Sequence, residues 1–363
     1  MTPSALPAVD TPALLIDLDV VKRNLERMQE KASTYEVALR PHIKTHKIPQ
    51  LALMQMSLGA CGITAAKVSE AEVMAQAGID DIFIANQIVA KEKLERLSGL
   101  ASKVRVSLGL DSVDAARRLS DVFVAAGRTI DYLIEIDTGL NRCGVLPGKA
   151  AVDLLKAVDT LPALRFKGIF THAGQVYGAR SLSEVLEISR RESEGVAETA
   201  QALHRIGVSS RITSVGSTPT MKVWEGHRAI NEIRPGNYIF NDAMQVSLGV
   251  AQAEDCALTV LATVTSRPVK TRAVIDAGSK VLALDKGARG FGLVLGKNAI
   301  LERLFEEHGV MVLDPDEDVD IGDRIRLIPN HACPVINLFD WAYGITNSQI
   351  VEEFRIAARG KSQ

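Results

Sequence analysis

The chain has 363 residues, of which 47% are hydrophobic and 24% charged, and its formal net charge is −2. This length is more than one domain usually holds, so we expect two domains. A charge so close to zero gives no reason to expect a nucleic acid or an anionic membrane as a partner. No run of about 18 apolar residues predicts a membrane span, and residues 1–10 lack the pattern of a signal peptide.

The four cysteines are spread along the chain without any paired spacing. They are Cys61, Cys143, Cys256 and Cys333. This distribution favours thiols in a reducing compartment over a disulfide framework. The sequence therefore predicts a soluble cytoplasmic protein.

The first two thirds of the chain alternate between short apolar segments and helical patterns. Residues 11–19 predict a buried strand, with Asp19 as the N-cap of the next helix. Eight further segments are expected as strands: residues 37–40, 62–65, 81–85, 104–108, 132–137, 166–172, 211–216 and 232–235. Eight such units in about 220 residues fit a closed (β/α)8 barrel of the TIM type. An open doubly wound sheet is the alternative, but no GxGxxG motif supports one.

The pattern changes in the last third of the chain. Short β-like runs separated by Gly, Pro and Asp follow one another, and only residues 301–307 have a helical pattern. This predicts a barrel domain over residues 1–248, followed by a smaller, mostly-β domain over residues 249–363. Residues 1 to about 20 are candidates to pack with the second domain.

The working face of a barrel of this type lies at the carboxyl ends of its strands. Lys44 follows the first barrel strand, within the segment RPHIKTHK at 40–47. Alternation along an extended chain would put Arg40, His42 and His46 on the same face as Lys44. Crowding of cationic groups and burial both favour a neutral amine, which Schiff-base chemistry needs. A basic surface turn is the alternative for any single lysine.

Further polar residues follow later strands. Arg142 lies just past the fifth barrel strand, His172 ends the sixth, and GSTPT at 216–220 follows the seventh. The glycine allows a ligand to approach the backbone closely, and the hydroxyls offer hydrogen-bond donors. The loops after the seventh and eighth strands of such barrels frequently bind phosphate. By itself this motif also fits a capped turn. A lysine and a phosphate loop in one barrel mouth indicate pyridoxal phosphate, held at both of its ends.

Matching segments occur in order nearly from end to end of the chain. They are DTPALLID (10–17), RPHIKTHK (40–47), KVSEA (67–71), GLNRCG (139–144), THAGQVY (171–177), GSTPT (216–220), RPGNY (234–238), IDAG (275–278), EHG (307–309) and PNHACPVINL (329–338). On these segments the chain resembles the fold-type III pyridoxal-phosphate enzymes, which have an alanine-racemase-like barrel. Within that group it resembles the D-threonine aldolase and D-serine dehydratase family.

The resemblance assigns roles residue by residue. It implies that Lys44 forms the Schiff base. It implies a phosphate end made by Gly216, Ser217 and Thr218 with Tyr238, and a cofactor pocket lined by Arg142, His172 and Tyr177. It also implies a homodimer, because enzymes of this group commonly place each barrel mouth against the partner's second domain.

A second reactive pair lies in the β-rich domain. His331 and Cys333 are two positions apart, so on an extended segment their side chains would leave the same face and could share one ion. A buried histidine and a buried cysteine are the alternative. The resemblance implies a divalent metal here, on a histidine followed two residues later by Cys or Asp. Two protein ligands leave room for water or substrate, and imidazole with thiolate favours zinc, with manganese as the alternative.

The expected substrates are small D-3-hydroxy amino acids. Loss of the α-proton to Lys44, with the metal taking the β-hydroxyl, would give a 2-oxo acid and ammonia from D-serine or D-3-hydroxyaspartate. Removal of the β-hydroxyl proton, by His172 or by a metal-bound hydroxide, would give glycine and an aldehyde. The family's dehydratases resemble this chain in having Cys at the second ligand position, so Cys333 favours a dehydratase over a D-threonine-type aldolase.

Other activities explain less of the sequence. An amino-acid racemase of the same barrel group is the next alternative, but it does not account for the pair His331 and Cys333. A non-catalytic pyridoxal-phosphate carrier would share the barrel and Lys44, whereas this chain has about a hundred further residues beyond such a barrel. We therefore expect a lyase.

Overall fold

The computed structural model describes residues 9–363, so the expectations for residues 1–8 lie outside the described residues. The chain divides into two units. The barrel unit comprises residues 28–44, 49–236 and 361–363, and the β unit comprises residues up to 27 together with 45–48 and 237–360. The division after residue 236 comes earlier than the expected domain boundary after residue 248. Among the described residues, no helix is long and apolar enough to cross a membrane.

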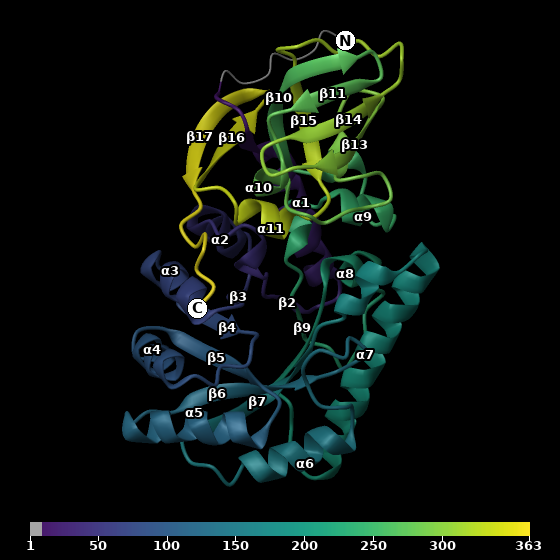
Figure 1. Cartoon of the computed structure of the whole chain (residues 1–363). Helices are drawn as coiled ribbons and strands as arrows, with labels where there is room; N and C mark the ends of the chain where they lie inside the picture. The colour runs from purple at the N-terminus through teal and green to yellow at the C-terminus, as the bar shows by residue number, and fades with distance from the viewer. Residues whose placement is uncertain (1–8) are drawn as a thin grey trace. The chain divides into compact units, whose positions relative to one another are not determined.

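The barrel unit is built on an eight-stranded parallel sheet in the order β2-β9-β8-β7-β6-β5-β4-β3 (Figure 1). Its strands are β2 (Ala38–Leu39), β3 (Ile63–Ala65), β4 (Asp81–Ile84), β5 (Arg105–Leu110), β6 (Ile130–Ile136), β7 (Leu164–Thr171), β8 (Ile212–Val215) and β9 (Glu232–Ile233). A parallel bridge between His42 and Thr64 links the two edges of this curled sheet. The predicted barrel, with all eight of its expected strands, is therefore confirmed.

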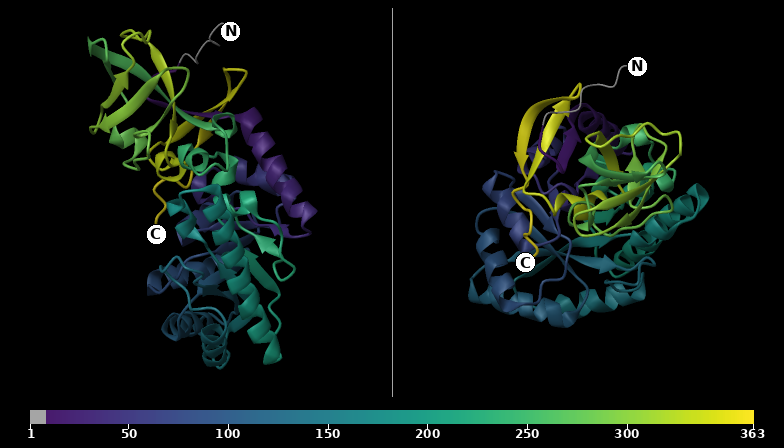
Figure 2. Two further views of the ribbon diagram at one scale, coloured as in Figure 1. Left: turned by 90° about the vertical axis from the view of Figure 1, so that its right-hand side faces the viewer. Right: turned by 45° about the horizontal axis from the view of Figure 1, so that its top comes forward.

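Helices follow the strands and lie along the outer side of the curled sheet (Figure 2). They are α2 (Pro49–Ser57), α3 (Val68–Gln76), α4 (Lys91–Ala101), α5 (Val113–Ala125), α6 (Lys149–Val158), α7 (Leu182–Arg205) and α8 (Thr218–Val223). Helix α5 illustrates their amphipathic pattern, because it buries Ala115, Ala116, Leu119 and Phe123 at helical spacing. These buried stripes hold the helices against the sheet.

The helix expected after Asp19 begins one residue before that position. Helix α1 spans Leu18–Thr34, so Asp19 lies in its first turn. The cap is instead Asp17, whose Oδ1 accepts the N–H of Val20 at 3.1 Å. The prediction failed because two aspartates flank Leu18, and the end of strand β1 (Ala13–Asp17) decides which of them precedes the helix.

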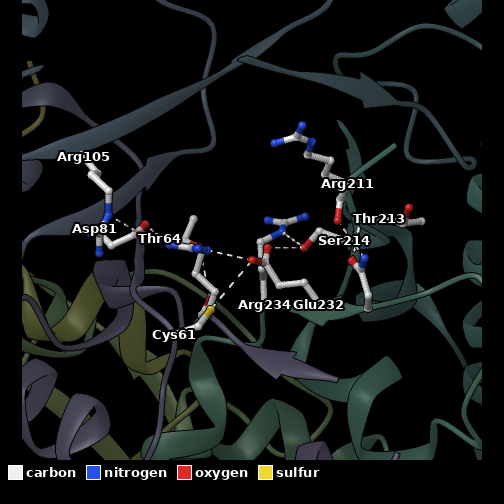
Figure 3. A network of polar contacts seen from close by, with 11 residues as sticks. Cys61, Thr64, Asp81, Arg105, Arg211, Thr213, Ser214, Glu232 and Arg234 are labelled. Carbon is white, nitrogen blue, oxygen red and sulfur yellow. Dashed lines mark hydrogen bonds and ion pairs between the residues drawn. The ribbon is translucent and has the colours of Figure 1, made fainter. Parts of the chain in front are cut away.

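The interior of the barrel contains a chain of paired polar groups (Figure 3). The Arg40 guanidinium lies 2.6 Å from Asp81 and 2.8 Å from Glu232. Glu232 also accepts the Ser214 hydroxyl at 2.7 Å, and Arg234 donates to the Ser214 oxygen at 2.8 Å. Arg40, Glu232, Ser214 and Arg234 are all buried. Such groups are tolerated inside a protein because each one is hydrogen-bonded.

The β unit contains a nine-stranded sheet in the order β11-β14-β13-β12-β15-β10-β1-β16-β17, and β10 also pairs with β11. Its strands after β1 are β10 (Leu258–Val269), β11 (Arg272–Ile275), β12 (Gly292–Val294), β13 (Ala299–Leu304), β14 (Gly309–Leu313), β15 (Arg324–Pro329), β16 (Trp341–Thr346) and β17 (Gln349–Arg355). The pairing of β10 with β11 closes strands β10 to β15 into an antiparallel barrel. Strand β1 pairs with β10 and β16, so this N-terminal strand is part of the sheet of the β unit.

One helical prediction in this unit is wrong. Residues 301–307 were expected to be helical, but strand β13 covers Ala299–Leu304 and pairs antiparallel with β14. Ala299 and Leu301 are buried, whereas Ile300, Glu302 and Arg303 are exposed. The spacing of Leu301, Leu304 and Phe305 satisfies a helix, but alternate burial against β14 satisfies a strand, and pairing with β14 decided the outcome.

Candidate functional site

Lys44 lies immediately beyond the first barrel strand, in a short 3-10 turn over Ile43–Thr45. The side chain is half-buried. The chain is not extended here, so the alternation expected from Arg40 to His46 is wrong. Arg40 is held by Asp81 and Glu232. The Nδ1 of His42 accepts the backbone N–H of Lys44 at 3.3 Å.

His172 is the centre of the polar group at the carboxyl ends of the strands. Its Nδ1 lies 3.2 Å from the carbonyl oxygen of Gly216, and a carbonyl only accepts, so Nδ1 carries the proton. Burial, followed by the positive charges of Lys44, Arg142 and Arg234, lowers the pKa of His172 to about 3. The ring is therefore neutral at physiological pH. Lys44, Arg142 and His172 each follow the carboxyl end of a strand of the same parallel sheet, so they lie at one end of the barrel.

Arg142 lies on the loop after β6, and two acidic residues organise that loop. The Oδ1 of Asp137 accepts the N–H groups of Gly139 at 2.9 Å and of Asn141 at 3.1 Å. Glu135 lies 3.9 Å from the Arg142 guanidinium, which is 54% exposed. Burial raises the pKa of Glu135. The Arg142 guanidinium is therefore largely exposed to solvent, and one of its nitrogens lies near the buried Glu135 carboxyl group.

The segment after β8 forms a tight capped turn. Gly216 has φ of 138°, and a Cβ at this position would lie 2.9 Å from the backbone nitrogen of Arg234, so glycine is required. The Gly216 N–H donates to Glu192 at 2.9 Å, and the Ser217 N–H donates to Thr220 at 3.1 Å. Ser217 is the N-cap of α8, with a capping box to Thr220. A phosphate at this turn would therefore depend on the hydroxyls and on Thr218 rather than on these two amides.

The two tyrosines predicted for the cofactor pocket lie in different units. Tyr177 is half-buried in the 3-10 turn Gly174–Gly178 of the barrel unit. This turn is tied to the β6 loop by Gln175, which donates to the carbonyl of Thr138 at 3.2 Å. Tyr238 belongs to the β unit, in the turn Asn237–Ile239, where it is buried.

The pair in the β unit lies at the start of a short helix rather than on an extended segment. His331 is the N-cap of α11 (Ala332–Ile336), with φ −135° and ψ 109°, and Cys333 lies in the first turn. The prediction of extended backbone is therefore wrong. The two side chains nevertheless meet in a hydrogen bond.

Acidic groups surround this pair. Burial by itself lowers the pKa of His331, but the hydrogen bond and charge of Cys333 and the carboxylates of Asp242 and Asp285 outweigh it and raise the pKa to about 9. The Asp285 carboxylate lies 3.5 Å from His331 Nδ1. The Asp242 side chain accepts the N–H of Ala332 at 3.0 Å.

This donor set fits an open metal site. Imidazole and thiolate are both ligands for zinc, and a carboxylate behind the imidazole is the usual support for a ligating histidine. The Thr45 hydroxyl lies 3.3 Å from the Cys333 sulfur. Within residues 9–363, no group of three or more His, Cys, Asp or Glu side chains is arranged to hold a metal ion. A bound ion would therefore keep positions for water or substrate.

Sequence reasoning missed several buried acids that organise these sites. Glu192 is fully buried on α7. It occupies the same helical stripe as the buried residues Val185, Ser189 and Val196. A charged residue on such a stripe is a signal that could have been found from the sequence. Asp242, also fully buried, gave no such signal because its helix α9 (Ala243–Ser247) is too short to show a periodicity.

Comparison with known proteins identifies both parts of the chain. Residues 16–243 match the family model described as the alanine racemase N-terminal domain, and residues 257–345 match a serine dehydratase domain. The chain is 34% identical to D-threonine aldolase of Arthrobacter sp over 365 residues, which cover 99% of this chain and 95% of that protein. It is 35% identical to D-threo-3-hydroxyaspartate dehydratase of Delftia sp. (strain HT23) over 351 residues, which cover 90% of this chain and 92% of that protein.

A solved structure agrees with these matches. The D-threonine aldolase from Filomicrobium marinum is 38% identical and superposes with a TM-score of 0.88, covering 98% of this chain and 97% of that one. Because the resemblance extends over both units, it concerns the whole chain rather than the barrel alone. The chain belongs to the family of fold-type III pyridoxal-phosphate enzymes that combines an alanine racemase-type barrel with a serine dehydratase domain.

Proposed function

We propose that this protein is a pyridoxal-phosphate- and metal-dependent lyase that removes water from small D-3-hydroxy amino acids, giving a 2-oxo acid and ammonia. D-serine and D-threo-3-hydroxyaspartate are the expected substrates. The observation that carries the proposal is the gathering of Lys44, Arg142 and a neutral His172 at one end of the barrel, beside the capped turn at Gly216. A reactive amine and a turn rich in hydroxyls are what the two ends of this cofactor require.

The residues that we propose to hold the cofactor are those that the family resemblance assigns. Lys44 would hold its aldehyde carbon, and Ser217, Thr218 and Tyr238 would hold its phosphate. Arg142, His172 and Tyr177 would line its ring. When bound, pyridoxal phosphate supplies an electron sink that makes the α-proton of an amino acid acidic. The Lys44 amine is the basic group in this set that can accept that proton.

The protonation state of His172 favours elimination of water over cleavage of the carbon skeleton. An aldolase needs a base for the β-hydroxyl proton. His172 has its Nδ1 proton engaged by Gly216 and a pKa of about 3, so it is a poor acceptor. We therefore assign His172 to orienting the cofactor ring and not to taking the β-hydroxyl proton.

His331 and Cys333 would hold the divalent ion, which we propose to be zinc, with manganese as the alternative. A bound ion withdraws electrons from the β-oxygen and makes hydroxide a better leaving group. The acidic surroundings of Asp242 and Asp285 favour a cation at this position. Cys333 rather than an aspartate at the second position supports the dehydratase assignment.

A D-threonine-type aldolase is the second candidate. The observation that favours it is the 34% identity with the Arthrobacter D-threonine aldolase, which covers 99% of this chain. The assignment of elimination rather than cleavage is therefore best tested on the products themselves.

The deciding experiment compares products from three substrates. Purified protein with pyridoxal phosphate and either zinc or manganese is incubated separately with D-serine, D-threonine and D-threo-3-hydroxyaspartate. Oxo acid and ammonia without glycine, abolished by a chelator, are the expected result. Glycine with an aldehyde would establish the aldolase instead. Neither set of products, despite a Schiff-base absorbance band, would point to a racemase.

We further propose that the protein is a cytoplasmic homodimer. All four cysteines lie in the described part of the chain, and none forms a disulfide. This is what a reducing compartment requires.

Light scattering coupled to size-exclusion chromatography tests the proposed dimer by measuring the mass in solution. A mass equal to a single 39.2 kDa chain would contradict the dimer.

A further inference from the structure

Glu192 connects the two strand ends on which the proposed cofactor site depends. It lies on α7 and its side chain is fully buried. A single oxygen, Oε1, accepts the N–H of Gly216 at 2.9 Å and the N–H of Ala173 at 3.2 Å. Gly216 begins the turn after β8, and Ala173 follows His172 after β7. One carboxyl oxygen therefore bridges the turn that offers hydroxyls and the residue next to the imidazole.

The same two strand ends are joined a second time through His172. The carbonyl of Gly216 accepts the Nδ1 proton of His172 at 3.2 Å, while the N–H of Gly216 is held by Glu192. The two polar groups of this glycine are thus both engaged, and its φ of 138° allows no side chain. A shift of the Glu192 oxygen would move Gly216 and Ala173 together, and with them the imidazole and the start of α8.

We propose that Glu192 is a positioning residue of the cofactor site, which sets the spacing between His172 and the phosphate-binding turn at Ser217 and Thr218. The inference rests on the proposed function and deepens it. Glu192 acts through Gly216 and Ala173, and nothing in the arrangement requires it to touch the cofactor. The length of the Glu192 side chain, which sets the distance from the α7 backbone to Oε1, determines where Gly216 and Ala173 are held.

The surroundings of Glu192 indicate that reach, and not charge, is the requirement. Burial raises the pKa of Glu192 to about 7, against the opposing effects of Thr220, the two backbone N–H groups and Arg234. Among the described residues, the second oxygen, Oε2, has no hydrogen-bond partner. The two backbone N–H groups therefore share one acceptor, Oε1, at a fixed distance, which a neutral amide oxygen can also supply.

The test compares two substitutions that separate reach from charge. Glu192→Gln keeps the reach and removes the charge, whereas Glu192→Asp keeps the charge and shortens the side chain by one methylene. Thr199→Val is the matched control. Thr199 is equally buried on α7, and its hydroxyl accepts the N–H of Gly148 at 2.9 Å, away from both strand ends.

Each metal-loaded protein, stripped of cofactor, is titrated with pyridoxal 5′-phosphate and with pyridoxal, which lacks the phosphate. We expect Glu192→Asp to weaken pyridoxal-phosphate binding by about tenfold or more, the effect of one lost hydrogen bond, and pyridoxal binding by less than about threefold. Glu192→Gln and Thr199→Val should stay within about threefold of the wild-type protein for both ligands. A thermal melt of each protein separates these effects from loss of folding.

The outcomes distinguish the inference from the function on which it rests. Equal weakening of both ligands by Glu192→Asp, or weakening by Thr199→Val as large as that by Glu192→Asp, would reduce Glu192 to a general structural role. Loss of binding in Glu192→Gln with retention in Glu192→Asp would make charge the requirement and overturn the inference. A wild-type protein that binds neither ligand would overturn the proposed function, and the inference with it.

Discussion

Arg40 and Glu232 form a buried ion pair inside the barrel unit, with Nε and Oε2 2.8 Å apart. Glu232 also accepts the hydroxyl of Ser214 at 2.7 Å, and Ser214 in turn accepts from Arg234 at 2.8 Å. Arg234 also donates to the carbonyl of Thr171, the residue before His172. The paired groups in the barrel interior are therefore continuous with the strand end that carries the imidazole.

Removal of Glu232 should destabilise the protein strongly. Glu232→Ala leaves Arg40 buried with Asp81 as its remaining carboxylate, so we expect a loss of about 3–5 kcal/mol in the free energy of unfolding. Glu225→Ala is the control, because its pair with Arg190 is 3.0 Å long but exposed, and it should cost less than about 1 kcal/mol. Urea unfolding measures both. Similar values for the two variants would show that the buried pair contributes little.

Gly216 should not tolerate a side chain. Its φ of 138° and the backbone nitrogen of Arg234, 2.9 Å from an added Cβ, oppose any substitution. We expect Gly216→Ala to lower stability by more than about 1 kcal/mol and to weaken pyridoxal-phosphate binding at least tenfold. Gly207→Ala is the matched control, because Gly207 also has a positive φ, of 79°, and an added Cβ meets no described atom within 4 Å. A Gly216→Ala protein that binds the cofactor normally would contradict a role for this turn.

The neutral state of His172 should make the cofactor-free protein less stable in acid. The folded-state pKa is lowered from 6.5 to about 3, so the unfolded state binds a proton that the folded state excludes. Stability is then fully present above pH 6.5 and is lost as the pH falls toward 3, by about 1.4 kcal/mol per pH unit. His172→Asn, which supplies an N–H to Gly216 but cannot titrate, should lose about 2 kcal/mol less than the wild type between about pH 7.5 and about pH 5. Parallel pH profiles for the two proteins would rule out this assignment.

Asp285 should strengthen metal binding without being a ligand. Its carboxylate lies 3.5 Å from His331 Nδ1, where it can orient the ring. We expect Asp285→Asn to weaken zinc binding by about 10–100-fold, measured by competition with a chromophoric chelator. Asp316→Asn, an exposed substitution in the same unit, is the control. Unchanged zinc affinity in Asp285→Asn would show that this carboxylate does not support metal binding by His331.

Much of the fold and of the candidate site could be predicted from the sequence. The strands of the barrel unit are short apolar runs bounded by helical patterns, and this local periodicity survives folding because the parallel sheet buries both of its faces. Lys44, His172 and the turn at Gly216 were predicted from their positions directly after such strands. The pair His331 and Cys333 was predicted from two residue types at close spacing, although the backbone that joins them is not extended.

What only the tertiary structure decided is the partner of each side chain. Leu301 has a spacing that suits a helix, but pairing with β14 makes its segment a strand. Arg40 belongs to a cationic cluster in the sequence, but Asp81 and Glu232, distant along the chain, engage it in the fold. Glu192 is an unremarked acid in the sequence that joins two strand ends in three dimensions. Local periodicity depends only on residues close together in the sequence, so it can be read from the sequence alone. Hydrogen bonds and ion pairs depend on which distant segments the closed sheets bring together.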